Sequence, residues 1–144
     1  MKEMAASYTL WAFWILLDEQ NRVLLVLRND IPFWNLPWWW LESWETPWEA
    51  VVREIKEETG LEAEVERLVG IYAKEYKDDI VFLFLCKKVW GSLVLNDEAQ
   101  AFERYEKDKL PENIFQNHKV RILDFFSQSS ETVTLKKHSQ LLKR

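Results

Sequence analysis

The sequence predicts an α+β or α/β fold in which a mixed β-sheet is sandwiched between helices. Two observations carry this prediction. Segments with strand character and segments with helical character follow one another in the order strands, helix, strands, helix, which is typical of layered sandwiches. The chain is 144 residues long, enough for one core that buries about 68 to 70% of the unfolded surface.

The first two strands are expected near the N-terminus. An apolar run extends from Leu10 to Leu17 and ends at a polar turn over residues 18–21. The next run, Arg22 to Arg28, consists mainly of valine and leucine, residues that suit a sheet. Residues 29–44 are expected to form a loop that leads into a helix.

The central helix is expected over Pro47–Thr59. Thr46 is a residue type that caps helix N-termini, and proline is well suited to the first helical turn. Gly60 is suited to end the helix. Apolar residues at helical spacing predict the face that turns toward the core, namely Ala50, Val51 and Ile55.

The second half of the chain predicts a hairpin, a short strand and a second helix. Residues 62–76 and 80–89 have strand character and flank a Lys-Asp-Asp turn. A short strand is expected near residues 102–105. Apolar residues at helical spacing then predict a helix over about residues 117–126.

Composition indicates a single soluble domain. We expect one domain over residues 1–130, followed by a C-terminal strand or disordered tail over residues 131–144. The apolar run at residues 10–17 is too short to span a bilayer, and no small-residue cleavage site follows it. The one cysteine, Cys86, is expected to be a buried small hydrophobe in a reducing cytoplasm. A net charge of −5 with both signs interspersed argues against nucleic-acid and membrane partners.

Three acids on the central helix are candidates for a metal site. Glu54, Glu57 and Glu58 are spaced i, i+3 and i+4, so their carboxylates share one helix face. Like charges at this spacing repel one another, and a hard divalent cation such as Mg²⁺ would offset that repulsion. Acid spacing alone leaves an ordinary solvated helix face as the alternative.

The spacing of these acids with their neighbours is the most specific feature of the chain. Glu45 is followed by Arg53-Glu54-Ile55, then by Glu57-Glu58, then by Gly60-Leu61. This pattern resembles the signature of the Nudix hydrolases, G-x5-E-x7-R-E-U-x-E-E-x-G-U, in which U is an aliphatic residue. Every position from Glu45 onward fits that signature.

The resemblance covers about residues 8 to 127 and implies the Nudix fold, an α/β/α sandwich with a mixed sheet. It also implies Mg²⁺-dependent hydrolysis, with Mn²⁺ as the alternative ion, of a nucleoside diphosphate linked to another moiety. In that reaction water attacks a phosphorus atom. A diphosphate repels both nucleophile and base until cations neutralise it, after which a carboxylate can take a proton from water. The expected partner is therefore a small nucleotide, and the oligomeric state stays open.

The resemblance further implies a role for each charged residue of the motif. Glu57 and Glu58 are expected to be the main Mg²⁺ ligands, with Glu54 beside them as a ligand or a supporting group. Glu45 is expected to complete the metal site from the loop. Arg53 is expected to orient these carboxylates through charge-assisted hydrogen bonds, and a plain helix salt bridge is the compatible alternative.

Other candidate residues lie outside the motif. In the Nudix family a general base often comes from a later loop, and Glu98 is the first candidate here, with Glu103 as the second. Arg28 and Trp34 are candidates for contacts with the phosphate and the base of a nucleotide, although both equally fit structural roles. The two histidines are expected to be surface groups, since neither has a partner at metal-ligand spacing: His118 and His138.

Tryptophan stands where the signature has glycine. The Nudix signature has glycine at position 39, and usually also at 38, 40 and 44, but this chain has tryptophan at all four. The chain contains three glycines, whereas roughly 7% average usage gives about ten. We infer a glycine-to-tryptophan variant, or an incorrect record, of a natural Nudix protein, and the same hypothesis covers positions 11, 14 and 90.

These tryptophans predict a disturbed site. Glycine tolerates a positive φ and close approach of the backbone, and tryptophan does neither easily. We therefore expect the loop before the helix to be displaced, with Glu45 pulled away from Glu57 and Glu58. The rival function is a catalytically impaired Nudix-fold domain that binds a nucleotide or a protein, because indole rings offer stacking surfaces to bases.

Overall fold

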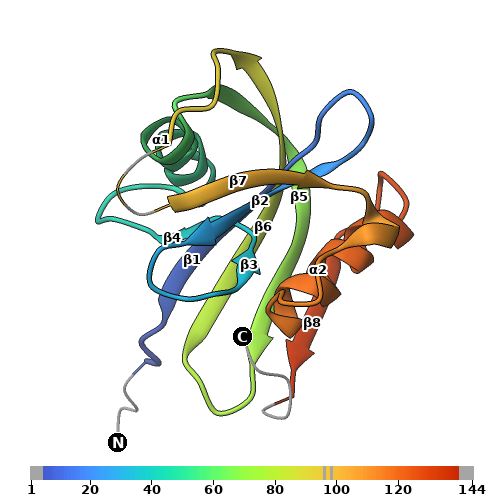
Figure 1. Cartoon of the computed structure of the whole chain (residues 1–144). Helices are drawn as coiled ribbons and strands as arrows, with labels where there is room; N and C mark the ends of the chain where they lie inside the picture. Colours follow the sequence, from blue (N-terminus) through green and yellow to red (C-terminus); the bar gives the residue numbers. More distant parts are fainter. Residues whose placement is uncertain (1–4, 96, 98, 140–144) are drawn as a thin grey trace, which may run out of the picture.

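The computed structural model describes residues 5–95, 97 and 99–139, which form two β-sheets, two α-helices and one short 3-10 helix (Figure 1). Five strands make up the larger sheet: β1 Thr9–Leu16, β4 Trp38–Trp40, β5 Glu62–Lys74, β6 Asp79–Trp90 and β8 Thr134–His138. Their order in the sheet is β4-β1-β6-β5-β8. β1 is parallel to β6 and β5 is parallel to β8, whereas the other two pairs are antiparallel. The predicted mixed sheet is thus confirmed.

The smaller sheet is antiparallel. It contains β2 Val23–Arg28, β3 Trp34–Asn35 and β7 Ala99–Tyr105, in the order β3-β2-β7. The sequence predicts β2 and the second half of β7. It does not predict β3 and β4, which lie in the segment expected to be a loop. These strands are only two and three residues long, too short for alternation to indicate them.

Helix α1, Pro47–Thr59, has the predicted bounds. The Thr46 hydroxyl accepts a hydrogen bond from the backbone N–H of Glu49 at 3.2 Å, and Gly60 ends the helix with φ of 80°. Helix α2 spans Gln116–Ser127, and the unpredicted 3-10 helix η1 spans Lys107–Lys109. In the described part of the chain, neither α-helix combines the length and apolar composition needed to cross a membrane.

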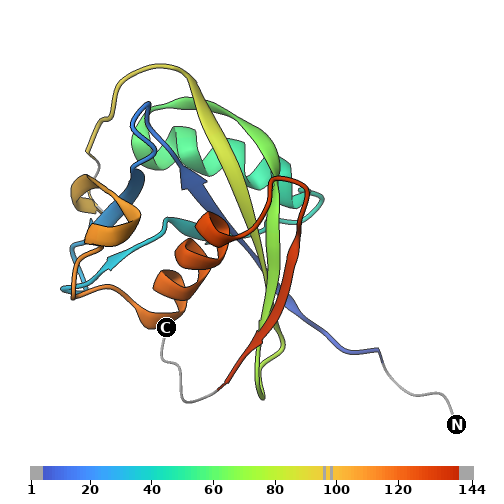
Figure 2. The same ribbon diagram turned by 90° about the vertical axis from the view of Figure 1, so that its right-hand side faces the viewer.

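The larger sheet lies between α1 and a layer made of α2 and the smaller sheet (Figures 1 and 2). Side chains of β1 alternate between the two cores because successive strand residues point to opposite faces. Ala12 and Trp14 pack in the core that includes the buried face of α1, and Cys86 is buried there as expected. Phe13 and Ile15 pack in the core that includes α2 and β2.

The tryptophan segment is ordered, so the expectation of a displaced loop is wrong. Strand β4 pairs with β1, and Trp38, Trp39 and Trp40 lie opposite residues 13, 12 and 11. None of these three has a positive φ, because each lies in an extended strand that tolerates a Cβ atom. Trp44 alone of the four has a positive φ, at 68°, and its side chain is fully exposed.

Both histidines are buried, so their expected surface location is wrong. His118 is 0% exposed, and its Nδ1 accepts a hydrogen bond from the backbone N–H of Leu36 at 3.0 Å. His138 is 1% exposed and stacks on the Tyr72 ring with a centroid distance of 5.4 Å. Aromatic neighbours thus bury two side chains that spacing alone placed at the surface.

His138 should make the protein sensitive to acid. Burial, helped by the nearby Arg121 and Lys136 charges, lowers the pKa of His138 to about 4, against about 6.5 in an unfolded chain. The unfolded state therefore binds more protons between these values, so the free energy of unfolding should fall as pH decreases from about 6.5 to 4. We expect His138→Phe, which keeps a ring against Tyr72, to reduce this loss in urea unfolding at pH 7.5 and 4.5. An equal loss in both proteins would contradict the assignment.

Candidate active site

The acidic face of α1 differs in exposure from residue to residue. Glu54 is buried at 6% exposure because it lies on the edge of the face that packs against the sheet. Glu57 is exposed and Glu58 is partly exposed. One helix thus presents one carboxylate shielded from water beside two that a ligand can reach.

Arg53 lies at the centre of the charged motif. Its Nε and Nη2 donate to the two carboxylate oxygens of Glu45 at 2.6 and 2.9 Å. Its Nη1 donates to Glu54 and, at 3.1 Å, to Glu57, and lies 3.9 Å from Glu42. A bidentate guanidinium–carboxylate pair fixes both distance and orientation. This geometry supports the expected positioning role of Arg53.

Glu45 is held in the motif by its own turn. The backbone N–H of Glu45 donates to the Glu42 carbonyl at 3.1 Å, and the Glu42 N–H donates to the Glu45 carboxylate at 3.2 Å. Together with the Arg53 bonds, these contacts keep Glu45 beside the helix. The expected separation of Glu45 from the helix acids is therefore wrong, because these hydrogen bonds hold Glu45 beside α1 although Trp44, the residue before it, has a positive φ.

The two carboxylates bonded to Arg53 have opposite pKa shifts. Hydrogen bonds from Arg53 lower the pKa of Glu45. Burial raises the pKa of Glu54 to about 7, with a contribution from the nearby Glu57 charge and against the effect of Arg53. Glu54 therefore holds a proton more readily than an ordinary glutamate, and a cation that binds beside it would compete with that proton.

The donor set of this site fits a hard divalent cation, since carboxylate oxygens are the ligands that such ions prefer. Within the described ranges, no three His, Cys, Asp or Glu side chains converge closely enough to hold an ion as they stand. Arg53 accounts for this, because it takes up the oxygens of Glu45, Glu54 and Glu57. Binding an ion requires these side chains to turn toward it.

Arg28 lies at the end of β2, beside the tryptophans. Its guanidinium pairs with Asp30 at 3.0 Å and lies over the Trp38 ring, 5.3 Å from the centroid. A pocket of about 350 Å³ opens here and is lined by Trp11, Arg28, Asp30, Ile31, Trp38, Trp39 and Trp40. Arg28 thus lines a pocket with indole walls, and phosphate binding by Arg28 stays a prediction.

Trp34 occupies a more structural position. Its ring makes an edge contact with Tyr105 at a centroid distance of 5.4 Å and packs against the core. Its backbone N–H donates to the Asn113 carbonyl at 2.8 Å. These contacts describe the structural alternative, and base stacking by Trp34 stays a prediction.

The structure gives less information about the two candidate general bases. Glu98 lies outside the described residues. Its neighbour Asp97 accepts a hydrogen bond at its carbonyl from the side chain of Asn29, which follows β2. The second candidate, Glu103, is exposed on β7, where its carboxylate accepts a hydrogen bond from the Arg104 N–H at 3.0 Å.

Sequence reasoning missed a buried polar group between the larger sheet and α2. Arg121 is 1% exposed, and its guanidinium lies over the rings of Phe13 and Tyr72 at 4.8 and 5.2 Å. Burial lowers its pKa to about 10. A single arginine in an amphipathic helix is usually exposed, so no pattern in the sequence could have indicated this position.

Comparison with known proteins identifies the arrangement. Residues 9–125 match the profile of the NUDIX domain. The chain belongs to the Nudix family. Its Nudix domain holds the carboxylates and the arginine described above, so the family resemblance based on residues 45–61 is confirmed.

Two curated Nudix relatives are similar over most of this chain. An ADP-ribose pyrophosphatase of Methanocaldococcus jannaschii is 36% identical over 112 residues, which are 73% of this chain and 66% of that protein. A putative 8-oxo-dGTP diphosphatase of Bacillus subtilis is 34% identical over 136 residues, which are 94% of this chain and 91% of that protein. These relatives and the domain match show a Nudix hydrolase.

A solved Nudix structure supports the fold. The crystal structure of an ADP-ribose pyrophosphatase from Streptococcus suis superimposes with a TM-score of 0.75 and 26% identity, covering 92% of this chain and all of the other. The predicted Nudix sandwich is thus confirmed. Nudix hydrolases generally use divalent metal ions, which agrees with the oxygen-rich donor set of α1.

Proposed function

We propose that this Nudix hydrolase cleaves a nucleoside diphosphate linked to another moiety, in a reaction that needs Mg²⁺ and in which water attacks a phosphorus atom. The observation that carries the proposal is the carboxylate group around Arg53, where Glu45, Glu54 and Glu57 all accept hydrogen bonds from one guanidinium. Such a group stabilises an ordinary surface poorly, because several acids gather around a single base.

Glu57 and Glu58 would hold the Mg²⁺, with Glu45 and Glu54 completing the oxygen set. When bound, Mg²⁺ neutralises the charge that a diphosphate presents to an incoming nucleophile. Arg53 keeps Glu45 in place through its paired hydrogen bonds. The raised pKa of Glu54 means that a proton on this carboxylate would have to leave when a cation enters.

Substrate contacts are proposed for two residues outside the carboxylate group, Arg28 and Trp34. Arg28 is already oriented by Asp30 and faces the indole-lined pocket, so it would bind a phosphate group. Trp34 would stack on the base. The names of the two relatives favour ADP-ribose and 8-oxo-dGTP as the first compounds to assay.

The reaction is tested by a screen of nucleoside diphosphate compounds with and without Mg²⁺, read as phosphate release after phosphatase coupling. We expect release from at least one compound, and only when Mg²⁺ is present. Release at the same rate in EDTA would contradict the proposal, and so would no release from any compound at high enzyme concentration.

Glu98 is proposed as the general base. A positioned base contributes typically about 10²- to 10⁴-fold to the rate, so Glu98→Gln should lower kcat by that factor while leaving Mg²⁺ affinity nearly unchanged. Glu103→Gln is the matched control, because it makes the same chemical change on β7. A larger loss in the Glu103 variant would show that the base has been assigned to the wrong carboxylate.

A second candidate function is nucleotide binding without turnover, and Trp38 favours it. The Trp38 ring is 8% exposed, stacks on Phe13 at a centroid distance of 5.6 Å and contacts His118 edge-on. It therefore fills space that glycine would leave open beside the buried polar residues of α2. If this space is needed for substrate, the chain binds nucleotides in the indole-lined pocket but hydrolyses them slowly.

A further inference from the structure

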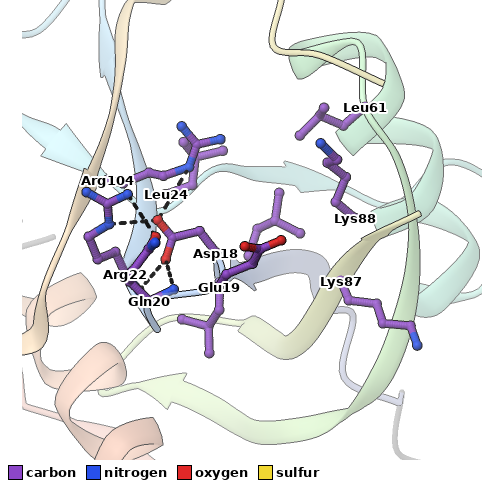
Figure 3. A pocket seen from close by; sticks show the side chains of 11 residues that line it. Asp18, Glu19, Gln20, Arg22, Leu24, Leu61, Lys87, Lys88 and Arg104 are labelled. Carbon is purple, nitrogen blue, oxygen red and sulfur yellow. Dashed lines mark hydrogen bonds and ion pairs between the residues drawn. The ribbon is translucent and has the colours of Figure 1, made fainter. Parts of the chain in front are cut away.

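A second pocket, called the hairpin pocket below, lies at the tight turn that connects β1 to β2 and has a volume of about 440 Å³ (Figure 3). Its lining comes from the end of β1, the turn after it, β2, β6, β7 and the segment just after α1, and consists of Leu16, Leu17, Asp18, Glu19, Gln20, Arg22, Leu24, Leu61, Lys87, Lys88 and Arg104. None of the acids around Arg53 lines it. The pocket is therefore separate from the candidate active site.

The floor of this hairpin pocket is apolar. Leu16, Leu24 and Leu61 are 5%, 2% and 1% exposed and belong to the core that also contains the buried face of α1. These leucines are fixed by core packing, so the floor is preformed. The partly exposed Leu17 extends this floor and supplies apolar surface that a planar or aliphatic part of a ligand can cover.

Two arginines on the wall are held by one carboxylate. Asp18 accepts a hydrogen bond from the Arg22 side chain at 2.7 Å, and the Arg104 Nε lies 3.9 Å from the same oxygen. The other Asp18 oxygen accepts from the backbone N–H groups of Gln20 and Arg22, both at 2.9 Å. Figure 3 shows both guanidinium groups gathered around Asp18, which limits their conformational freedom before a ligand arrives.

Positive charge exceeds negative charge in this pocket, although the whole chain carries a net charge of −5. The lining has four basic side chains and two acidic ones. Lys87 points away from Asp18 in Figure 3 and pairs with Glu64 at 3.1 Å. The basic groups that remain for a ligand are Arg22, Lys88 and Arg104, opposite the single additional acid Glu19.

We propose that the hairpin pocket binds a small phosphate-bearing molecule. The phosphate lies at Arg22 and Arg104, where each guanidinium offers N–H donors beyond those that contact Asp18, and the apolar part covers the leucine floor. Guanidinium groups suit phosphate because their planar donors match its oxygens in pairs. Such binding is an addition to the proposed hydrolysis and does not depend on it.

Phenyl phosphate is the direct probe, because it joins a phosphate to a planar apolar ring. Isothermal titration calorimetry should show binding to the full chain. Arg104→Gln should weaken it about tenfold, the loss of one charge-assisted hydrogen bond, and Lys88→Gln should weaken it as well. Glu19→Gln should strengthen binding, since it removes a repelling charge from the same pocket. Inorganic phosphate should bind more weakly than phenyl phosphate because it cannot cover the floor.

Two control variants test whether phenyl phosphate binds in the hairpin pocket. Lys119→Gln makes the same change of charge at an exposed position on α2 and should leave the affinity unchanged. Glu57→Gln should also leave it unchanged, since Glu57 lies in the candidate active site. Loss of binding in the Glu57 variant, or unaltered binding in the Arg104 and Lys88 variants, would overturn the proposal. Equal affinities for the two probes would overturn the role of the leucine floor.

Discussion

Glu57→Gln and Glu58→Gln should each reduce Mg²⁺-dependent hydrolysis to the background rate. Each substitution removes a charged oxygen that the proposed ion needs and leaves the core untouched, because the Glu57 and Glu58 side chains lie at the helix surface. Initial rates measured over a range of Mg²⁺ concentrations will show whether higher metal concentration restores activity. We expect only partial recovery, since one ligand is absent from the site.

These substitutions should not destabilise the fold. Removing one of several acids around Arg53 relieves like-charge repulsion in the metal-free protein, so the melting temperature should stay the same or rise. Glu49→Gln is the matched control, because it makes the same change at an exposed position in the first turn of α1. It should retain full turnover. Full activity of the Glu57 and Glu58 variants at saturating Mg²⁺ would end the assignment of the metal site.

Restoring glycine at positions 38, 39, 40 and 44 should raise both hydrolysis and Mg²⁺ affinity. The structure indicates two separate causes for this gain in hydrolysis and Mg²⁺ affinity. Trp44 has a positive φ of 68°, a conformation that disfavours residues with a Cβ atom by about 1 to 2 kcal/mol, so Trp44→Gly should relax the turn that carries Glu45. Trp38 fills space between Phe13 and His118, so Trp38→Gly should open room for substrate.

The two single substitutions should have opposite effects on stability. Trp38 is packed in the core, and its loss should lower the free energy of unfolding by about 3 to 5 kcal/mol, the range for large aromatic truncations. Trp44 is fully exposed, so its replacement removes strain and little packing, and stability should hold or rise. Urea unfolding, Mg²⁺ titrations and kcat/KM should be measured for both variants. Together they distinguish substrate access, which Trp38→Gly changes, from the geometry of the turn before α1, which Trp44→Gly changes.

Comparing the four-glycine protein with the present chain shows whether the site needs glycine at these positions. If the four-glycine protein and the present chain have equal Mg²⁺ affinity and equal turnover, the site tolerates tryptophan and the reason given for glycine there is wrong. If only Trp38→Gly raises turnover, obstruction of the substrate space accounts for the whole effect.

The helix at the centre of the site could be predicted from the sequence because its determinants are local. Thr46, Pro47 and Gly60 lie at its two ends, and each acts through bonds or φ values of adjacent residues. The carboxylates follow from helical spacing within one segment. The family signature added the contribution of Glu45, which directly precedes the N-cap Thr46 and contacts the helix through Arg53.

The antiparallel β5–β6 hairpin could be predicted from its short turn and is confirmed, but the parallel pairings could not be predicted, because they join segments far apart in the chain. β1 is parallel to β6, about 70 residues later, and β5 is parallel to β8. Apolar runs indicate that these segments are strands but not which of them are neighbours. β3 and β4 escaped detection for another reason, since strands of two and three residues are too short for alternation to indicate them.

The buried polar residues show the same limit of local patterns. Arg121 and His138 belong to α2 and β8, and Tyr72 from β5 packs beside both. Their positions depend on tertiary packing that brings three elements together. The general base could not be predicted from a pattern for another reason. Glu98 lies outside the Nudix motif, and its assignment rests only on its position in the chain.

The central claim is that the acidic face of α1 supports attack of water on a phosphorus atom. The most direct test is to incubate the chain with Mg²⁺ and a mixture of ADP-ribose and 8-oxo-dGTP in ¹⁸O-labelled water and to weigh the products by mass spectrometry. The account predicts one ¹⁸O atom in a phosphate group of a product, formed with Mg²⁺ and absent in the Glu57→Gln/Glu58→Gln double variant. Label that appears equally without Mg²⁺ or in the double variant would contradict the claim, as would no labelled product at all.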